Sequence, residues 1–316
     1  FHGINFDQLI ILLPPSDPQN DLDVKIFNND GSIASNCING ARCVGRFIKD
    51  NSLLASNKFK VKTDGGLWEL DNIENNIFSA AFEAKAEIIT KKVEAKGIEL
   101  SLDCINLGNL HGVTFENKQI DMRFLDIGES LQRNISFPDG INFGVAEKIN
   151  KNEVNLKVYE RGAGETLACG SGACAVAMVG ILQEKLATPV KVNFQSGSLL
   201  IDYDRETEII SAQGLTEFIE TKIIKIDVEN GEGANYHAVK DSYLALLKRR
   251  FKLNEEDAAL TAVYNSMWGQ SSSGTITVKQ DYFEDLDGYH YSIARVQDIS
   301  ENDLLVLEKY IYVNRV

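Results

Sequence analysis

Residues 160–174 read ERGAGETLACGSGAC, and residues 30–43 read DGSIASNCINGARC. In each phrase a cysteine, Cys169 or Cys37, is followed by any two residues and then by Gly-Ala. Each cysteine also opens a segment whose apolar residues have helical spacing. Two thiols placed alike in two parts of one chain indicate two acid/base groups that face each other across a single site. Such a pair suits a reaction that removes a proton from one face of a carbon and returns one to the other.

The two phrases belong to a weak internal repeat with an offset of 132 residues. The same offset relates five further pairs of identical residues: Gly40 and Gly172, Ala41 and Ala173, Val44 and Val176, Gly65 and Gly197, and Leu67 and Leu199. We interpret the repeat as two similar half-domains. Each half has the same predicted order of strand, glycine-containing turn, cysteine, helix and hairpin.

The predicted elements of the two halves follow from periodicity and turn residues. For the first half they are a strand over 24–27, a helix that contains 43–48, and a hairpin over 59–63 and 67–70. For the second half they are a strand over 154–159, a helix over 171–185, and a hairpin over 190–194 and 199–203. Further strands are expected over 86–93 and 98–102. Many strands and few helices predict an α+β fold with two pseudo-symmetric half-domains, each a curled, mostly antiparallel sheet around a central helix.

We therefore expect three units: an N-terminal half over 1–105, a second half over 106–225, and an accessory module over 226–316. The third unit begins near a turn at 229–233 and has its own α+β pattern. Its predicted elements are helices over 236–251 and 255–268, a hairpin over 275–283 and 289–296, and a last helix that ends near 310. No catalytic phrase stands out in this unit.

The net charge, the apolar runs and the cysteine number of the chain each argue against certain classes of protein. The net charge of −14 and the pI of about 4.8 argue against a broad nucleic-acid surface. No apolar run of about 18 residues is present, so a membrane span is not expected. The first residues have neither a basic segment nor an apolar core, so we expect no signal peptide there. Five cysteines, an odd number, fit a reducing cytoplasm better than a disulfide scaffold.

The thiolate is the reactive form of cysteine, and a helix N-terminus stabilises negative charge through its exposed N–H groups. Glycines within three residues of Cys37 and Cys169 let the backbone approach a bound anion closely. Cys43, Cys104 and Cys174 read more simply as small buried side chains. A zinc site built from four of the cysteines is an open alternative, although its spacings are wide. The RGAG phrase at 161–164 lacks the Gly-Lys-Ser/Thr ending of a phosphate loop.

Over residues 3–220 the chain resembles diaminopimelate epimerase, a member of the amino-acid racemases that work without pyridoxal phosphate. Three phrases carry the resemblance: NNDGS at 28–32 before Cys37, GNLH at 108–111, and the 160–172 segment around Cys169. In this resemblance Ile38 stands where the family usually has Gly, and Leu110 where it has Pro.

The resemblance implies Cys37 and Cys169 as the catalytic pair, with no cofactor and no metal. It implies that the substrate is held by Gln8, Asn28, Ile38, Asn39, Asn109, Asn142, Glu160, Arg161, Gly170 and Ser171, with His111 in a supporting role. Arg161 suits a carboxylate because guanidinium binds carboxylates in a bidentate manner. Backbone N–H groups at Gly170 and Ser171 suit the carboxylate next to the reacting carbon.

The predicted reaction is the conversion of LL-2,6-diaminopimelate to the meso form, which feeds lysine and peptidoglycan synthesis. Diaminopimelate is the expected partner, without nucleic acid or membrane, and a homodimer is one assembly that we consider. A second enzyme hypothesis is a related racemase that acts on proline or hydroxyproline. A non-enzyme hypothesis is a degenerate homologue that acts through its C-terminal module, which Ile38 would favour.

Overall fold

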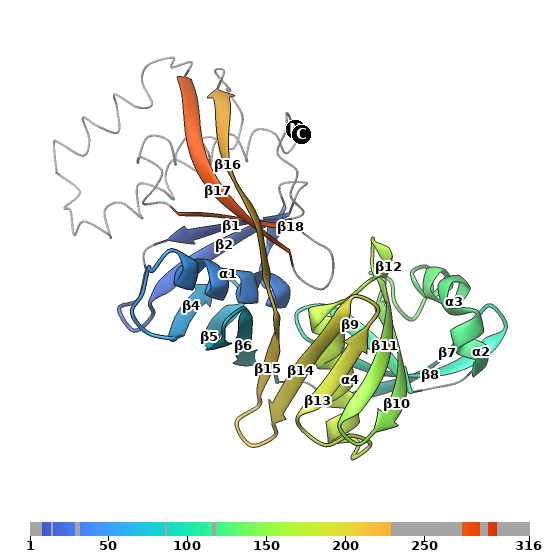
Figure 1. The fold of residues 1–316 in the computed structure, drawn as a ribbon. Coiled ribbons are helices and arrows are strands. Elements are labelled where there is room, and N and C mark those ends of the chain that lie inside the picture. The colour runs from blue at the N-terminus through green and yellow to red at the C-terminus, as the bar shows by residue number, and fades with distance from the viewer. Residues whose placement is uncertain are drawn as a thin grey trace, which may run out of the picture.

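The computed structural model describes residues 8–13, 15–28, 32–85, 87–115, 118–228, 274–284 and 290–295. The described chain has eighteen strands and four helices, so the predicted mixed α+β class, with mostly strand, is confirmed. Figure 1 shows two lobes, each with one long helix lying against curved strands. The helices are α1 and α4, and they are the elements that place the two cysteines.

The elements up to the end of the first lobe are β1 (Gln8–Leu13), β2 (Leu22–Asn28), β3 (Ile33–Ala34), α1 (Ile38–Asp50), β4 (Lys58–Thr63), β5 (Gly66–Glu74) and β6 (Ile77–Glu83). Within this lobe β1 pairs with β2, and β4 with β5 and β5 with β6, all antiparallel, while β2 and β4 run parallel. Phe47, Ile48, Trp68 and Leu70 are buried between α1 and these strands. Apolar burial on one side of α1 therefore fixes its direction.

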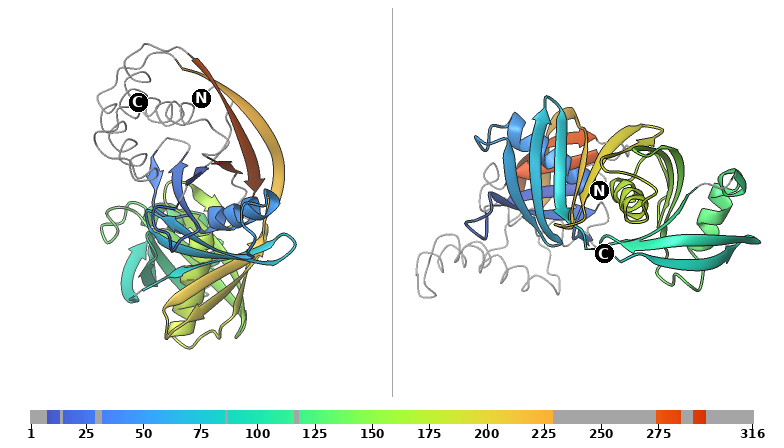
Figure 2. Two further views of the ribbon diagram at one scale, coloured as in Figure 1. Left: turned by 90° about the vertical axis from the view of Figure 1, so that its left-hand side faces the viewer. Right: turned by 90° about the horizontal axis from the view of Figure 1, so that it is seen from below.

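The second lobe is made of β7 (Ile89–Ala95), β8 (Ile98–Asn106), β9 (Leu110–Phe115), α2 (Lys118–Met122), α3 (Phe124–Leu131), β10 (Asn142–Asn150), β11 (Glu153–Glu160), β12 (Gly164–Thr166), α4 (Gly170–Leu182), β13 (Val190–Phe194), β14 (Gly197–Asp204) and β15 (Ile209–Leu215). Strands β7 and β8 pair with each other, and β8 pairs with β9, so they continue this lobe's sheet. The right-hand view of Figure 2 shows the strands curving around α4.

Helix α4 has no charged side chain, and nearly all of its residues are buried. A helix that is apolar on every side is stable only inside a core, which the curled sheet provides. The sequence pattern predicted this helix over 171–185, but it ends at Leu182. The helix ends there because Glu184 has a left-handed φ of 59° and the N–H groups of Lys185 and Leu186 turn back to the Gly180 carbonyl.

The lobes meet where β6 pairs with β15 in antiparallel register. Ala80 lies opposite Ala212 at the centre of this ladder, and the two residues are related by the 132-residue offset. Just beyond its two ends, Ala84 N–H donates to the Glu208 carbonyl at 2.8 Å and Thr216 N–H donates to the Asn76 carbonyl at 2.9 Å. The 132-residue offset relates Ala84 to Thr216 and Asn76 to Glu208, so each of these two hydrogen bonds is the repeat equivalent of the other. A local two-fold axis therefore passes through the Ala80–Ala212 pair.

After β15 the chain leaves the second lobe along β16 (Glu217–Val228), which runs back past the first lobe (Figure 1). Strand β16 pairs with β17 (Gly274–Glu284), β17 pairs with β18 (His290–Arg295), and β18 lies parallel to β1. The predicted strand pair in the C-terminal region is confirmed as the antiparallel β17–β18 pair. The helices predicted over 236–251, over 255–268 and near 310 lie outside the described residues. None of the described helices combines the length and apolar composition needed to cross a bilayer.

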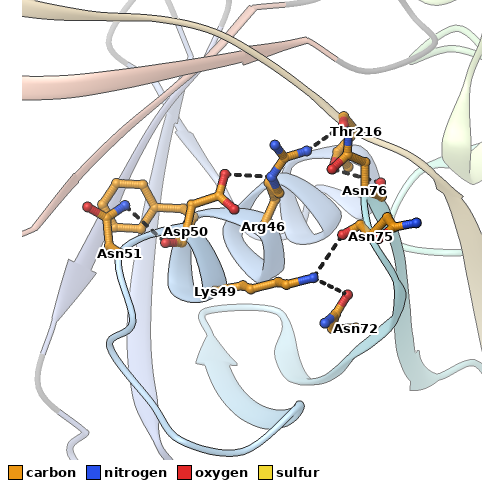
Figure 3. A network of polar contacts seen from close by, with 9 residues as sticks. Arg46, Lys49, Asp50, Asn51, Asn72, Asn75, Asn76 and Thr216 are labelled. Carbon is orange, nitrogen blue, oxygen red and sulfur yellow. Dashed lines mark hydrogen bonds and ion pairs between the residues drawn. The ribbon is translucent and has the colours of Figure 1, made fainter.

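The exit from the second lobe is fastened to the C-terminal end of α1 (Figure 3). Arg46 Nη1 donates to the Thr216 carbonyl at 3.1 Å, and Arg46 Nε pairs with Asp50 at 2.5 Å. Lys49 Nζ donates to Asn72 Oδ1 at 3.3 Å and to the Asn75 carbonyl at 3.0 Å. A first-lobe helix thus holds both the β5–β6 turn and the point where β15 passes into β16.

Replacing Arg46 by Met is expected to lower the free energy of unfolding by about 1–2 kcal/mol, because it removes the donor to Thr216 and leaves Asp50 unpaired. That loss corresponds to a fall of a few degrees in melting temperature, which differential scanning calorimetry measures. Arg133→Met is the control, since Arg133 pairs with Glu129 at 3.6 Å on the surface, with 82% of its side chain exposed. It should change stability by no more than about 0.5 kcal/mol. Equal melting temperatures for the two variants would contradict the fastening role of Arg46.

Candidate active site

Cys37 and Cys169 are the N-cap residues of α1 and α4. Both have extended backbone, with φ of −154° and −145°, and each sulfur accepts a hydrogen bond from the N–H of the third helical residue. The distances are 3.2 Å from Gly40 N and 3.3 Å from Gly172 N. The prediction that each cysteine directly precedes a helix is thus confirmed. A sulfur that accepts a helix N-terminal N–H is in an environment that favours the thiolate.

The N-terminal ends of the two helices touch. A Cβ added to Gly170, the first residue of α4, would collide with Asn39 Oδ1 and would lie 3.4 Å from Ile38 Cβ. Asn39 is held in that place because Arg42, a fully buried residue, donates from Nη2 to Asn39 Oδ1 at 2.9 Å. Ile38 is itself only 7% exposed and packs into the core. The cysteines immediately before these two helices therefore lie at the helix ends that meet.

Two side chains contact the Cys169 thiol. It donates to Glu160 Oε2 at 3.2 Å and lies 3.5 Å from Ser171 Oγ. The other carboxylate oxygen, Glu160 Oε1, accepts from Thr166 Oγ1 at 2.6 Å. Cys169 is 4% exposed, so the whole group is largely shielded from water.

Burial and the Glu160 carboxylate raise the pKa of the Cys169 thiol well above its usual value. Burial also raises the pKa of Glu160, while the hydrogen bonds from Thr166 and Cys169 act in the opposite direction. A thiol and a carboxylate therefore sit in hydrogen-bond contact in a buried environment. Such a pair can deliver a proton to a bound molecule or take one from it.

His111 connects to the same thiol through two polar side chains. His111 Nε2 lies 3.0 Å from Asn109 Oδ1, and Asn109 Nδ2 donates to Ser171 Oγ at 3.5 Å. Complete burial lowers the pKa of His111 to about 3, so its imidazole is neutral at ordinary pH. A neutral ring donates to Asn109 and fixes the orientation of that amide.

Asn142, at the start of β10, and Arg161, just after β11, lie together. Asn142 Oδ1 accepts from Arg161 N–H at 2.9 Å, and Asn142 Nδ2 donates to the Leu110 carbonyl at 3.3 Å. The Arg161 guanidinium donates to the Asp139 carbonyl at 3.1 Å. It borders an open cavity of about 590 Å³ together with Arg133, Tyr159 and Gly162. An exposed guanidinium on such a cavity can receive an anionic group.

On the first-lobe side, Gln8 and Asn28 lie opposite each other on β1 and β2. Gln8 Nε2 donates to Asn28 Oδ1 at 2.8 Å, and Asn28 Nδ2 donates to Ser32 Oγ at 2.9 Å. The 132-residue offset relates Asn28 to Glu160 and Asn39 to Ser171. The first lobe therefore has amides where the second has a carboxylate and a hydroxyl.

The predicted site residues fall into several groups. A chain of hydrogen bonds joins Cys169 to Glu160, Ser171, Asn109 and His111. Asn142 is linked to Arg161, Gln8 is linked to Asn28, and Gly170 lies against Ile38 and Asn39. Cys43, Cys104 and Cys174 are buried outside these contacts. In the described ranges no three His, Cys, Asp or Glu side chains are grouped so that they could hold a metal ion.

Sequence reasoning missed three supporting residues: Thr166, Arg42 and Gln132. Gln132 binds both the N–H and the carbonyl of Ile141, next to Asn142, with its amide nitrogen 2.8 Å from the Ile141 carbonyl. Thr166 lies inside the 160–174 phrase, and Arg42 inside the 30–43 phrase. Thr166 and Arg42 could have been predicted as supporting residues because they lie inside the two cysteine phrases. No local sequence motif identifies Gln132.

Comparison with known proteins places these features in a family. A family model described as diaminopimelate epimerase matches residues 2–79 and 104–219. Proteins named diaminopimelate epimerase from Stutzerimonas stutzeri (strain A1501) and Pseudomonas aeruginosa (strain LESB58) are each 35% identical over 213 residues. Those alignments cover 64% of this chain and 77% of each relative.

Among solved structures, a probable proline racemase from Agrobacterium radiobacter K84 matches with a TM-score of 0.52 at 12% identity. A phenazine biosynthesis protein of the PhzF family from Bacillus anthracis matches with a TM-score of 0.50 at 15% identity. Each alignment covers 66% of this chain, with 73% and 82% of the other chain respectively, and shows a shared fold. Because the family model matches more than half of the chain and includes both cysteine phrases, the chain belongs to the diaminopimelate epimerase family.

Proposed function

We propose that this protein inverts the α-carbon of LL-2,6-diaminopimelate to give the meso form. The observation that carries the proposal is the meeting of two helix N-termini that are each capped by a cysteine. Membership of an isomerase family that includes diaminopimelate epimerases supports the substrate class.

In the proposed reaction one cysteine acts as thiolate and takes the α-proton, while the C–H electron pair stays on the carbon. The opposite cysteine gives its thiol proton to the other face of that carbon, so the configuration is inverted and the total number of protons is unchanged. The two cysteines exchange their protonation states in each turnover, and they exchange roles in the reverse direction. Cysteine suits both roles because its pKa can be placed near neutrality by its surroundings.

The α-proton of an amino acid is weakly acidic, so the carbanion needs electrostatic stabilisation. In the proposed site the N–H groups at the start of α1 and α4 would hold the carboxylate next to the reacting carbon. Gly170 and Ser171 on one helix, and Ile38 and Asn39 on the other, supply that backbone. This arrangement concentrates the partial positive charge of two helices where negative charge develops.

The remaining proposed substrate contacts suit a molecule with a second polar end. Arg161 would bind the distal carboxylate from the rim of its cavity, with Asn142 fixing the backbone of that arginine. Gln8, Asn28 and Asn109 offer amide groups that both donate and accept. A compact substrate such as proline has no second carboxylate for Arg161.

The reaction is tested by following the α-proton signal of LL-diaminopimelate by NMR in D₂O with reduced protein. We expect the signal to disappear with the wild-type chain, and we expect formation of the meso isomer to be slower by at least about a thousandfold in Cys37→Ala and in Cys169→Ala, because each variant lacks one of the two groups that inversion needs. Cys43→Ala is the control, because Cys43 is buried in α1 away from the site. It should retain most of the rate.

Proline and hydroxyproline are run in the same assay. Exchange of their α-protons in preference to those of diaminopimelate would replace the proposed substrate by that of the related racemases. No exchange with any of the three, in folded protein with free thiols, would overturn the proposal of a racemase.

The contact between the helix ends gives a second test. Gly170→Ala places a methyl group where Asn39 Oδ1 lies, so Asn39 must leave Arg42 or the helix ends must separate. We expect the exchange rate to fall by about a hundredfold, because catalysis depends on the distance between the two thiols and the reacting carbon. Gly144→Ala is the matched control in the same lobe, since its new Cβ would meet only Leu156 and Val176, at 3.4 Å or more. Similar rates for both alanine variants would show that the contact does not set catalytic geometry.

A further inference from the structure

Several positions that the repeat relates differ between the two halves of the site, and three of these differences concern the surroundings of Cys169. Glu160, Thr166 and Ser171 in the second lobe correspond to Asn28, Ala34 and Asn39 in the first. A hydroxyl at position 166 therefore occurs in the half that has a carboxylate, while the half with an amide has alanine. This pairing indicates that the threonine serves the carboxylate and is not only part of the turn.

The turn between β11 and β12 delivers the threonine to that carboxylate. Gly162 and Gly164 have φ of 84° and 85°, values that other residues rarely adopt, and they let the chain reverse within three residues. In the resulting antiparallel pair, Glu160 lies opposite Gly164 and Val158 opposite Thr166. Thr166 Oγ1 then reaches Glu160 Oε1 at 2.6 Å.

The hydrogen bond from Thr166 decides which oxygen of Glu160 faces the thiol. With Oε1 occupied by Thr166, Oε2 is the oxygen that receives the Cys169 thiol at 3.2 Å. A hydrogen bond to a buried carboxylate favours the ionised form, which is the form able to accept a thiol proton. Burial alone moves the pKa of Glu160 upward, and the Thr166 hydroxyl works against that shift.

We propose that Thr166 is a positioning residue that orients Glu160 and keeps it ionised, and so controls proton transfer between Glu160 and Cys169. The inference rests on the proposed two-thiol reaction, because it assigns Glu160 to the thiol that this reaction uses. The step moves one proton from sulfur to the carboxylate oxygen and back, without any other change in bonding.

Other titratable groups near Glu160 come from several elements. Tyr159 lies on β11, and its ring packs against Phe124. Arg161 directly follows β11 and donates to the Asp139 carbonyl. From β12 comes the exposed Glu165, from β9 the neutral His111, and from the helix ends Cys169 and Cys37. Each of these stays in place when Thr166 is changed, so a changed pH response reports on the lost hydroxyl.

The test compares four variants with the wild-type chain. Thr166→Val keeps the shape and removes the hydroxyl, whereas Thr166→Ser keeps the hydroxyl. Thr90→Val is the matched control, because Thr90 Oγ1 donates to a carboxylate oxygen of Asp103 at 2.7 Å, far along the sequence on β7. Thr166→Ala is added so that the comparison does not depend on one variant folding well. The titration of Glu160 is read by ¹³C NMR of carboxyl-labelled protein, with Glu160→Gln to assign its signal.

In Thr166→Val and Thr166→Ala we expect the Glu160 titration to move to higher pH, because the carboxylate has lost a donor. The acid limb of the α-proton exchange rate should move the same way, with a rate about tenfold lower on that limb. Thr166→Ser and Thr90→Val should both follow the wild type. These NMR titrations need no substrate.

Two results would overturn the inference: a Glu160 titration that is unchanged without the Thr166 hydroxyl, or an equal loss of rate at every pH. The first would show that Thr166 does not act on the carboxylate, and the second that its effect is only structural. A different combination of results is a Glu160 titration that shifts in the Thr166 variants together with a wild-type protein that exchanges no α-proton. That combination would support the positioning role and refute the proposed function.

Discussion

The end-on contact between the starts of α1 and α4 is the constraint on which the rest of the structure depends. Two helix N-termini carry partial positive charge, and bringing them together is unfavourable unless negative charge or strong acceptors lie between them. The chain meets this condition with a sulfur acceptor at each N-cap. The close approach also requires that Gly170 have no side chain, since Asn39 occupies the place of its Cβ. The carboxylate binding that we propose would add negative charge at the same contact.

The contact is maintained by the way the lobes are joined. The β6–β15 ladder lies on the local two-fold axis, and hydrogen bonds related by the repeat close both of its ends. Arg46 then adds a tie from α1 to Thr216 that α4 does not repeat, because the equivalent position in α4 is Met178. Lys49 adds bonds within the first lobe, to Asn72 and Asn75, and its equivalent in α4 is Ile181. The two lobes are therefore joined symmetrically by the β6–β15 ladder and asymmetrically by Arg46.

The repeat made much of this arrangement predictable. A single offset identified both cysteines, both helices and their hairpins, because N-cap and turn residues act locally and leave their mark in the sequence. Contacts between segments that are far apart in the sequence have no local motif by which they could be predicted. The pairing of β7 with β8 and of β8 with β9 depends on sheet formation across a boundary that was expected at residue 105, within β8. Gln132 acts on a backbone nine residues away, and the Arg42–Asn39–Gly170 contact joins two lobes. Pattern analysis of one sequence contains no information on such contacts.

The symmetry of the backbone and the asymmetry of the side chains have different consequences for chemistry. Inversion needs two groups on opposite faces of one carbon, and a duplicated helix start supplies them with equal geometry. Two equal groups would have equal proton affinity, so a single proton would be divided between them and neither would have a fixed first role. The carboxylate at position 160, in place of the amide at position 28, breaks that equality. A carboxylate raises the proton affinity of the thiol beside it, which favours the protonated form of Cys169. In the two-thiol reaction that we propose, this asymmetry would make Cys169 the group that gives its proton first.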